Sequence, residues 1–268
     1  MRGVKRLKIL YLNVNGFFGD SSIKSILARN KCLCKVKNCR EDGLNRLISD
    51  LLIEKILTGG EEYDIIFLSE FDPQSSASIK FISEMKNNEY DYILPNAIKG
   101  EIKDTITSIT VCFIKNEKKE QWLDNNKSNK NIEDYLVWCE IGGKQKETPY
   151  ITGVHFISEE KMNAFIEEVK EKSYKDKDFI IFGDFNANSK KEMEKGNNNF
   201  FQELIDELKE FGAKEVKDND NKNTYRGITK IDRVITNMKD INVEIDESFF
   251  KEGMSDHAAI VITLPNYE

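Results

Sequence analysis

Short, continuously apolar runs recur along this chain, and several of them end in a carboxylate or an amide. Continuous apolar runs are typical of strands that are buried on both faces, as in a sheet covered by other layers. The polar residues that follow three of these runs are Asn13 with Asn15, Glu70, and Asp184 with Asn186. Because strand side chains alternate between faces, residues two positions apart leave a strand end in the same direction. The pattern therefore predicts one polar site assembled from the ends of several buried strands.

The apolar runs alternate with stretches whose apolar residues recur every three or four positions, as in helices that bury one face. Three such helical stripes begin at Leu44, Met162 and Phe200. The strand candidates are residues 7–13, 64–69, 90–94, 108–114, 135–141, 149–156, 178–183, 231–236, 241–245 and 258–264. We expect the polar segments 115–134 and 217–223 to be exposed loops. This alternation of strands and helices predicts an α/β fold.

A chain of 268 residues is long enough for one large α/β domain, and its four prolines and lack of a Gly/Ser tract reveal no linker. We therefore expect residues 1–268 to form a single domain and to act as a monomer. No apolar stretch approaches ~18 residues, so no membrane span is predicted. The basic N-terminus leads straight into a strand candidate, not into a signal peptide, so a cytoplasmic location is expected.

The basic residues are concentrated near the N-terminus. Ten Lys or Arg but only one Asp lie in residues 1–40, although the whole chain has a formal net charge of −7. A basic segment on an acidic body suggests a local surface for a polyanion. Lys31, Lys35 and Lys37 in the segment 22–40 are the candidate substrate-binding residues. The alternative is a solvated charged loop that binds nothing.

Five cysteines make an odd count, and without a secretion signal a disulfide framework is not expected. Cys32, Cys34 and Cys39 lie within the basic segment and are candidate zinc ligands, although a closed structural site usually needs a fourth ligand. Cys112 and Cys139 lie in apolar runs and are predicted to be core residues.

Only two histidines occur in the chain, and both adjoin apolar runs. His155 ends the run 150–154, and His257 stands just before the run 258–262. A histidine beside an apolar run is often a structural residue. Its position at a strand end, however, also suits acid–base or phosphate chemistry.

Six short motifs occur in a fixed order from the first predicted strand to the last. They are LNVNG at 12–16, LSE at 68–70, TGVH at 152–155, GDFN at 183–186, IDRV at 231–234 and SDH at 255–257. With them the chain resembles the endonuclease/exonuclease/phosphatase superfamily, which includes deoxyribonuclease I, abasic-site endonucleases, inositol polyphosphate 5-phosphatases and bacterial sphingomyelinases. The resemblance covers essentially the whole chain. It implies a four-layered α/β sandwich of two packed mixed β-sheets flanked by helices, with the active site at the strand ends.

The resemblance also implies a divalent-metal-dependent phosphoester hydrolase, and the residue types suit that chemistry. A hard cation such as Mg²⁺ (or Mn²⁺) prefers oxygen ligands and neutralises charge on a phosphate. Glu70 is the candidate principal ligand, and Asn13, Asn15 and Asp256 are further candidates for the metal site.

The same resemblance implies catalytic roles for five residues. Asp184 would orient or deprotonate the attacking water, and Asn186 would hydrogen-bond a phosphate oxygen. Asp232 would hold His257 in one tautomer, so that the ring acts as a cation on the phosphate or as a base on water. His155 would contact the phosphate or protonate the leaving group.

Each of these residues also has a purely structural interpretation. Asn13 and Asn186 could be turn residues, because Asn is common where strands end. Asp232 could form a surface ion pair with Lys230 or Arg233. The joint order of the six motifs favours the catalytic interpretation.

Two departures from the family pattern bear on the substrate. Abasic-site endonucleases usually carry an acid where this chain has Asn15 and a tyrosine where it has His155, which places the chain nearer the deoxyribonuclease I and phosphatase branches. The flanking motifs of 5-phosphatases are absent. Three functions remain open: a phosphodiesterase or endonuclease acting on nucleic acid, with DNA as the expected substrate; a phosphatase or phosphodiesterase acting on a small or lipid phosphoester; and a non-catalytic binding module. The basic segment favours the first.

Overall fold

The computed structural model describes residues 6–18, 39–93, 108–120, 122–124, 138–143, 148–172, 177–186, 200–218 and 220–265. The predicted substrate-binding residues Lys31, Lys35 and Lys37 lie outside the described residues. The cysteines Cys32 and Cys34 lie outside them as well, and Cys39 is described only through its backbone, at the start of a helix. The basic surface and the zinc site therefore stay predictions.

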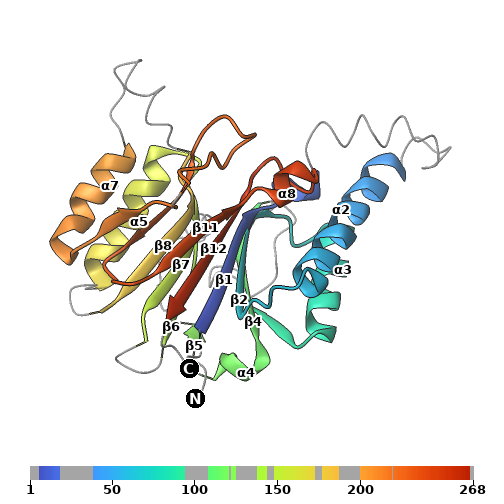
Figure 1. Cartoon of the computed structure of the whole chain (residues 1–268), viewed down its shortest axis with the longest axis horizontal. Coiled ribbons are helices and arrows are strands. Elements are labelled where there is room, and N and C mark those ends of the chain that lie inside the picture. The colour runs from blue at the N-terminus through green and yellow to red at the C-terminus, as the bar shows by residue number, and fades with distance from the viewer. Residues whose placement is uncertain are drawn as a thin grey trace.

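Two mixed sheets pack face to face at the centre of the molecule (Figure 1). In spatial order, the first contains β11 (Asn242–Asp246), β12 (Ala259–Pro265), β1 (Arg6–Asn13), β2 (Ile65–Phe71), β4 (Ile109–Lys115) and β3 (Tyr90–Ile93). The second contains β5 (Trp122–Asp124), β6 (Trp138–Gly143), β7 (Tyr150–His155), β8 (Phe179–Asp184), β10 (Asp232–Thr236) and β9 (Lys214–Val216). All ten predicted strands are confirmed, with ends that shift by up to three residues.

Helices cover the outer face of each sheet. The first sheet is covered by α2 (Cys39–Thr58) and α3 (Ser76–Asn87), and the second by α5 (Glu159–Lys172) and α7 (Phe200–Leu208) (Figure 1). The short elements are α4 (Asn116–Lys119), α8 (Ser248–Lys251) and the 3₁₀ turns η1 (Asn15–Phe17) and η5 (Lys209–Phe211). The predicted four-layered α/β sandwich is thereby confirmed. Within the described ranges, no helix is long and apolar enough to cross a membrane.

Three apolar layers explain why the strands read as continuous apolar runs. In β1, Leu10 and Leu12 pack toward α2 and α3, whereas Ile9 and Tyr11 belong to the core between the sheets. The strand β8 alternates in the same way between the inter-sheet core and the layer beneath α5 and α7. A sheet that is buried on both faces has no polar side, so the alternation of polar and apolar residues disappears.

Two segments that we predicted as exposed loops contain buried structure. The strand β5 lies within 115–134, and its Trp122 is only 3% exposed in the inter-sheet core. In the segment 217–223, Asp218 is buried because its carboxylate pairs with Lys230 at 2.9 Å. The prediction was wrong for β5, because a three-residue strand is too short to show a period. The described residues of 217–223 form a loop, as predicted, and it is exposed apart from the buried Asp218 and the half-buried Lys222.

The strand directions bring the polar strand ends to one edge of the sandwich. β1 runs parallel to β2, and β7 runs parallel to β8, so the two strands of each pair end together. The register sets His155 beside Asp184 on one side and Asp232 beside Asp184 on the other. The predicted core cysteines, Cys112 and Cys139, are buried between the sheets away from this edge's polar residues.

Candidate active site

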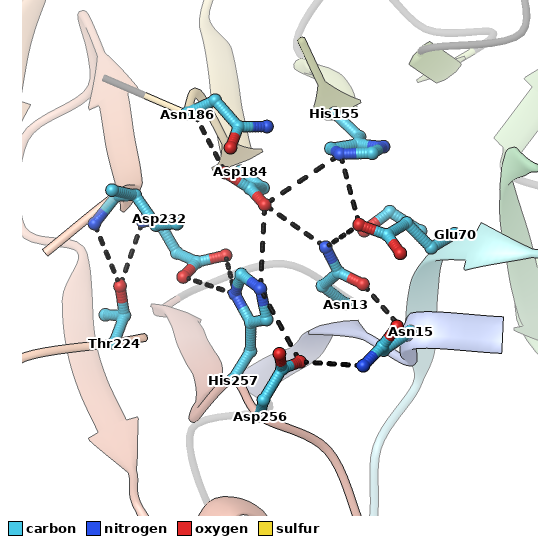
Figure 2. A network of polar contacts seen from close by, with 12 residues as sticks. Asn13, Asn15, Glu70, His155, Asp184, Asn186, Thr224, Asp232, Asp256 and His257 are labelled. Atoms are coloured by element: carbon cyan, nitrogen blue, oxygen red, sulfur yellow. Dashed lines mark hydrogen bonds and ion pairs between the residues drawn. The ribbon is translucent and has the colours of Figure 1, made fainter. Parts of the chain in front are cut away.

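The polar residues at these strand ends form one connected network (Figure 2). It contains nine residues that the sequence predicted: Asn13, Asn15, Glu70, His155, Asp184, Asn186, Asp232, Asp256 and His257. They come from both sheets and from the loops beside them, so the site is built where the two sheets meet.

Asn13 links the two sheets through its amide. Its Nδ2 donates to Glu70 Oε1 at 2.9 Å and to Asp184 Oδ2 at 3.1 Å. Its Oδ1 accepts from the backbone N of Asn15 at 2.9 Å, which fixes which end of the amide faces the acids. The completely buried Asn13 therefore holds one carboxylate from each sheet at a set position, and it is more than a turn residue.

Glu70 lies near the end of β2, where the strand is distorted. The pairing with β4 shifts register between Leu68 and Phe71, and Glu70 has a φ of 51°. Such a bulge re-aims a side chain, and a positive φ at a non-glycine residue persists where the surroundings maintain it. The carboxylate that is re-aimed here lies 3.4 Å from His155 Nε2 and keeps 32% of its side-chain exposure. Glu70 thus forms the open side of the network.

His257 is held by Asp232 deep in the site. Its Nδ1 lies 2.9 Å from Asp232 Oδ2 and 3.2 Å from Oδ1. Asp232 is completely buried, and its backbone N donates to Thr224 Oγ1 at 2.9 Å. Lys230 and Arg233 pair with other acids, so the alternative of a surface ion pair at Asp232 is wrong.

The two buried acids determine the charge of His257. Burial lowers the pKa of His257, but the Asp232 and Asp184 carboxylates outweigh burial and raise it to about 9. Burial and the Asp232 charge raise the pKa of Asp184 to about 7, against the opposing charge of His257. At neutral pH His257 is therefore a cation whose Nε2 faces Asp184 Oδ2 at 3.7 Å. Asp184 titrates near neutral pH, which suits a general base.

His155 has the opposite character. Its Nε2 lies 3.4 Å from Glu70 Oε1 and 3.9 Å from Asp184 Oδ2. Burial lowers the pKa of His155 from 6.5, although the Glu70 charge opposes this effect. The ring is neutral at neutral pH, so it is suited to contact a ligand or a cation and poorly suited to release a proton.

Asn15 and Asp256 form the other side of the network. Asn15 Nδ2 donates to Asp256 Oδ1 at 3.2 Å. Asp256 Oδ2 lies 3.3 Å from the guanidinium of Arg226, whose side chain is 51% exposed. Both oxygens of Asp256 thus have partners within the protein, whereas Glu70 has an open face.

Asn186 reaches the site by a different route from the predicted one. β8 ends at Asp184, and Asn186 has a φ of 50°. Its backbone N donates to Asp184 Oδ1 at 2.8 Å, and its Nδ2 donates to the carbonyl of Phe156 at 3.0 Å. The expectation that strand alternation orients Asn186 was wrong, because a local turn closed by the Asp184 carboxylate replaces the strand. Asn15 is likewise outside β1, in η1.

Among the residues that the structure describes, two groups of side chains have ligand atoms within 4.8 Å of one another: Glu70, His155 and Asp184, which we call the metal group, and Asp184, Asp232 and His257. In the second, the His257 cation already compensates the buried acids. In the metal group a neutral imidazole faces two carboxylates, one of them open to solvent, and this donor set suits a divalent metal ion. The amide of Asn13 orients both carboxylates, as groups that support metal ligands do.

Sequence reasoning missed several residues that hold the catalytic candidates. Ser255 Oγ donates to the backbone carbonyl of Asn13 at 2.5 Å and accepts from His257 N at 3.0 Å. The Tyr225 ring centroid lies 4.9 Å from that of His257, and Thr224 supports the strand that carries Asp232. Ser255 carried a signal, because it opens the SDH motif. Thr224 and Tyr225 lie in a polar stretch without a pattern.

No protein-family model and no curated protein matches the chain by sequence. Solved structures, in contrast, match it along almost its whole length. The endonuclease domain of TRAS1, a telomere-specific non-LTR retrotransposon, has a TM-score of 0.59 and 13% identity, covering 97% of this chain and 98% of that chain. An endonuclease/exonuclease/phosphatase family protein from Bacteroides thetaiotaomicron has a TM-score of 0.58 and 14% identity, covering 99% of each chain. This chain has the endonuclease/exonuclease/phosphatase fold.

The endonuclease/exonuclease/phosphatase fold is shared by proteins named for different substrates. The mannosyl-6-phosphatase Bt3783 of Bacteroides thetaiotaomicron matches with a TM-score of 0.56 and 14% identity, covering 96% of this chain and 99% of that chain. The match in fold confirms the resemblance that the six motifs carried. At these identities the fold leaves the substrate of this chain open.

Proposed function

We propose that this protein is a divalent-metal-dependent phosphoester hydrolase. The observation that carries the proposal is the convergence of the metal group with the buried Asp232–His257 pair at one strand edge. Phosphoester hydrolysis needs neutralised phosphate charge, an oriented water and a stabilised leaving oxygen. The site offers a group for each of these tasks, and the fold supports the same reading.

The metal group would hold Mg²⁺ or Mn²⁺, with Glu70 and Asp184 as oxygen ligands, His155 beside them and Asn13 orienting both acids. When bound, the ion would supply charge neutralisation on the phosphate and on the leaving oxygen. Asn15 and Asp256 stay candidates on the far side of Asn13, where they bond to each other.

Four residues would act on the phosphate and on the attacking water. His257, as a cation fixed by Asp232, would donate from Nε2 to a phosphate oxygen and stabilise negative charge that develops there. Asp184 would orient the attacking water molecule and accept a hydrogen bond from it. Asn186 uses Nδ2 on Phe156, and its second Nδ2 hydrogen would reach a phosphate oxygen. The neutral His155 would contact the phosphate.

We further propose nucleic acid, with DNA first, as the substrate class. The basic segment 22–40 follows the first strand of the site directly in the chain. Lys31, Lys35 and Lys37 would contact the phosphate backbone there, as cations do in most nucleic-acid complexes. The fold match to the TRAS1 endonuclease domain supports this choice.

A small phosphoester is the second candidate. It is favoured by the fold match to a mannosyl-6-phosphatase and by the net charge of −7, which repels a polyanion from most of the surface. In this case the catalytic residues keep their roles and the basic segment has no part in substrate binding.

Three substrates separate these functions. Hydrolysis of supercoiled plasmid, bis-p-nitrophenyl phosphate and p-nitrophenyl phosphate would be measured with and without Mg²⁺. We expect Mg²⁺-dependent nicking of plasmid and cleavage of the diester. Cleavage of the monoester alone would favour a phosphatase. No hydrolysis of any of the three would point to a binding module and would contradict the proposal.

The nucleic-acid assignment has a separate test in the salt dependence of DNA binding. Each phosphate contact that is lost lowers the slope of log affinity against log salt by about 0.9 on duplex DNA. The test variant changes Lys31, Lys35 and Lys37 together to Ser. In this variant we expect the slope of log affinity against log salt to be flatter by up to ~3, and hydrolysis of bis-p-nitrophenyl phosphate to be unchanged. The control replaces the exposed lysines Lys80, Lys119 and Lys214. An unchanged slope would remove the basic segment from substrate binding.

A further inference from the structure

A single tyrosine hydroxyl joins three strands directly beneath the metal group. Tyr11 is completely buried in β1, two residues before Asn13. Its Oη donates to the carbonyl of Val154 at 3.0 Å and accepts from the backbone N of Asp184 at 2.9 Å. Ser69 Oγ lies 2.7 Å from the same oxygen.

The single hydrogen and both acceptor positions of the Tyr11 hydroxyl are engaged in hydrogen bonds. The phenol of a tyrosine keeps its hydrogen at neutral pH, because its ordinary pKa is about 10. That hydrogen goes to Val154, because a carbonyl can only accept. The hydroxyl of Ser69 must then donate its own hydrogen to Tyr11. The Tyr11 oxygen therefore donates once and accepts twice.

Every partner of Tyr11 is a member of the metal group or its immediate neighbour. Ser69 precedes Glu70 on β2, Val154 precedes His155 on β7, and the third partner is the backbone of Asp184 itself on β8. The strand β2 belongs to the first sheet, and β7 and β8 belong to the second. One oxygen atom thus connects the backbone supports of all three members across the gap between the sheets.

The surrounding packing leaves the tyrosine ring little freedom. It meets Phe182 edge-on, with centroids 5.9 Å apart at 73°. A Cβ at Gly153 would lie 2.5 Å from the Phe67 ring, and a Cβ at Gly183 would lie 2.0 Å from the Val154 carbonyl. Glycines at these two positions allow β7 to lie close to the Phe67 ring of β2 and β8 to lie close to the backbone of β7. The Tyr11 hydroxyl can therefore reach its three partners.

We propose that Tyr11 is a positioning residue that sets the spacing of the metal group through its hydroxyl. The expected effect of Tyr11 on catalysis rests on the proposed function, whereas its effect on the positions of the metal-group residues does not. Tyr11 is completely buried and would touch no substrate. It acts through the strand ends that carry Glu70, His155 and Asp184.

The test removes the hydroxyl and keeps the ring, in Tyr11→Phe. The matched control is Tyr90→Phe, because Tyr90 is also buried and its hydroxyl binds the Tyr63 carbonyl, at the opposite end of β2 from Glu70. For Tyr11→Phe we expect Mn²⁺ affinity to fall about 10-fold and kcat on bis-p-nitrophenyl phosphate to fall about 10–100-fold, the range typical of groups that support metal ligands. KM should stay within about twofold at saturating Mn²⁺, because the substrate contacts are untouched.

The control separates positioning from stability. Tyr90→Phe should also lower the melting temperature, by a smaller amount because one hydrogen bond is lost instead of three, and it should keep wild-type Mn²⁺ affinity and kcat. Ser69→Ala, which removes one partner and leaves Tyr11 in place, should show a smaller loss of affinity in the same direction. Wild-type affinity and kcat in Tyr11→Phe would overturn the proposal, and so would equal losses in Tyr90→Phe.

A metal-free measurement keeps this proposal distinct from the proposed function. In the apo protein, amide hydrogen exchange at Asp184 should quicken and the His155 ring resonances should shift in Tyr11→Phe and not in Tyr90→Phe. If wild-type protein neither binds Mn²⁺ nor cleaves any phosphoester, the proposed function fails and these two readouts still decide the role of Tyr11. Unchanged exchange and unchanged resonances would overturn it.

Discussion

The two edges of the sandwich carry their charges in opposite ways. At the edge where β2 begins and β4 ends, the acids are exposed and paired with lysines. Glu61 lies 2.8 Å from Lys8, and Glu62 pairs with Lys115. The side chains of Glu61 and Glu62 are 48% and 82% exposed. In both pairs the acid is exposed to solvent, and its lysine partner is largely covered.

At the edge where β2 ends, the acids are buried and their partners are histidines and amides. The side chains of Asp184 and Asp232 are 2% and 0% exposed. Exposed ion pairs contribute about 0–1 kcal/mol to stability, whereas buried charges without full compensation are costly. Both edges of the sandwich therefore carry acids. At the edge with the candidate site, burial of the carboxylates costs free energy, and binding of a cation and a phosphate would offset that cost.

The largest expected effect comes from removing the open acid at the site edge. Glu70→Gln keeps the side-chain volume and removes the charge that would hold the metal. Hydrolysis should fall by about 10³-fold or more, since several kcal/mol of metal-derived stabilisation are lost. The control at the opposite edge, Glu62→Gln, should keep the wild-type rate. Mg²⁺ titrations of diester hydrolysis measure both, and near wild-type turnover in Glu70→Gln would rule out its assignment as a ligand.

The next effect tests whether Asp232 and His257 act as one unit. Asp232→Asn and His257→Gln should each lower kcat by about 10²–10⁴-fold, the range of general acid–base groups. The double variant should lose little more than the more severe single variant, because the second substitution removes a group that has already lost its partner. Losses that multiply would show that the two residues act separately. The surface pair Lys8 and Glu61, each changed to Gln, should leave kcat unchanged.

The charge states can be read from the two histidines directly. In metal-free protein, NMR titration should give His257 a pKa of about 9 and His155 a pKa below 6.5. Since the folded pKa of His257 is raised, its protonation stabilises the fold fully below pH 6.5, and this contribution is lost as the pH rises through about 9. Asp232→Asn should bring the His257 pKa down. A His257 pKa near 6.5 in the wild type would contradict its cationic role.

The smallest effect is expected at the solvated edge. Glu62→Gln should change the free energy of unfolding by less than about 0.5 kcal/mol, because an exposed pair is screened by water. Asp232→Asn should cost about 3 kcal/mol, since it leaves the buried His257 without its partner. Urea denaturation at pH 7 measures both. Equal costs would remove the distinction between the two edges.

Much of this molecule could be predicted from its residues. The continuous apolar runs of β1 and β8 indicated strands buried on both faces, and the inter-sheet core confirms this. Motif order identified the polar residues that gather at the strand ends, including both histidines. The loop prediction was wrong for β5, because a very short strand leaves no periodic signal. In the exposed loop 217–223, the ion pair with Lys230 that accompanies the burial of Asp218 left no signal either.

The apolar patterns of the sequence by themselves predicted an α/β fold with polar residues at its strand ends. The resemblance carried by the six motifs added the four layers and the candidate site residues that the structure brings together. Only the tertiary structure decided how those residues bond. Asn13 donates a hydrogen bond to Asp184, which is 171 positions away in the sequence. Asn186 lies in a turn after its strand, and the Tyr11 hydroxyl connects strands from two sheets. It also decided the direction of the pKa shift of each histidine, upward for His257 and downward for His155. Burial and the distance to neighbouring charges set a pKa, and both arise when the sheets pack together.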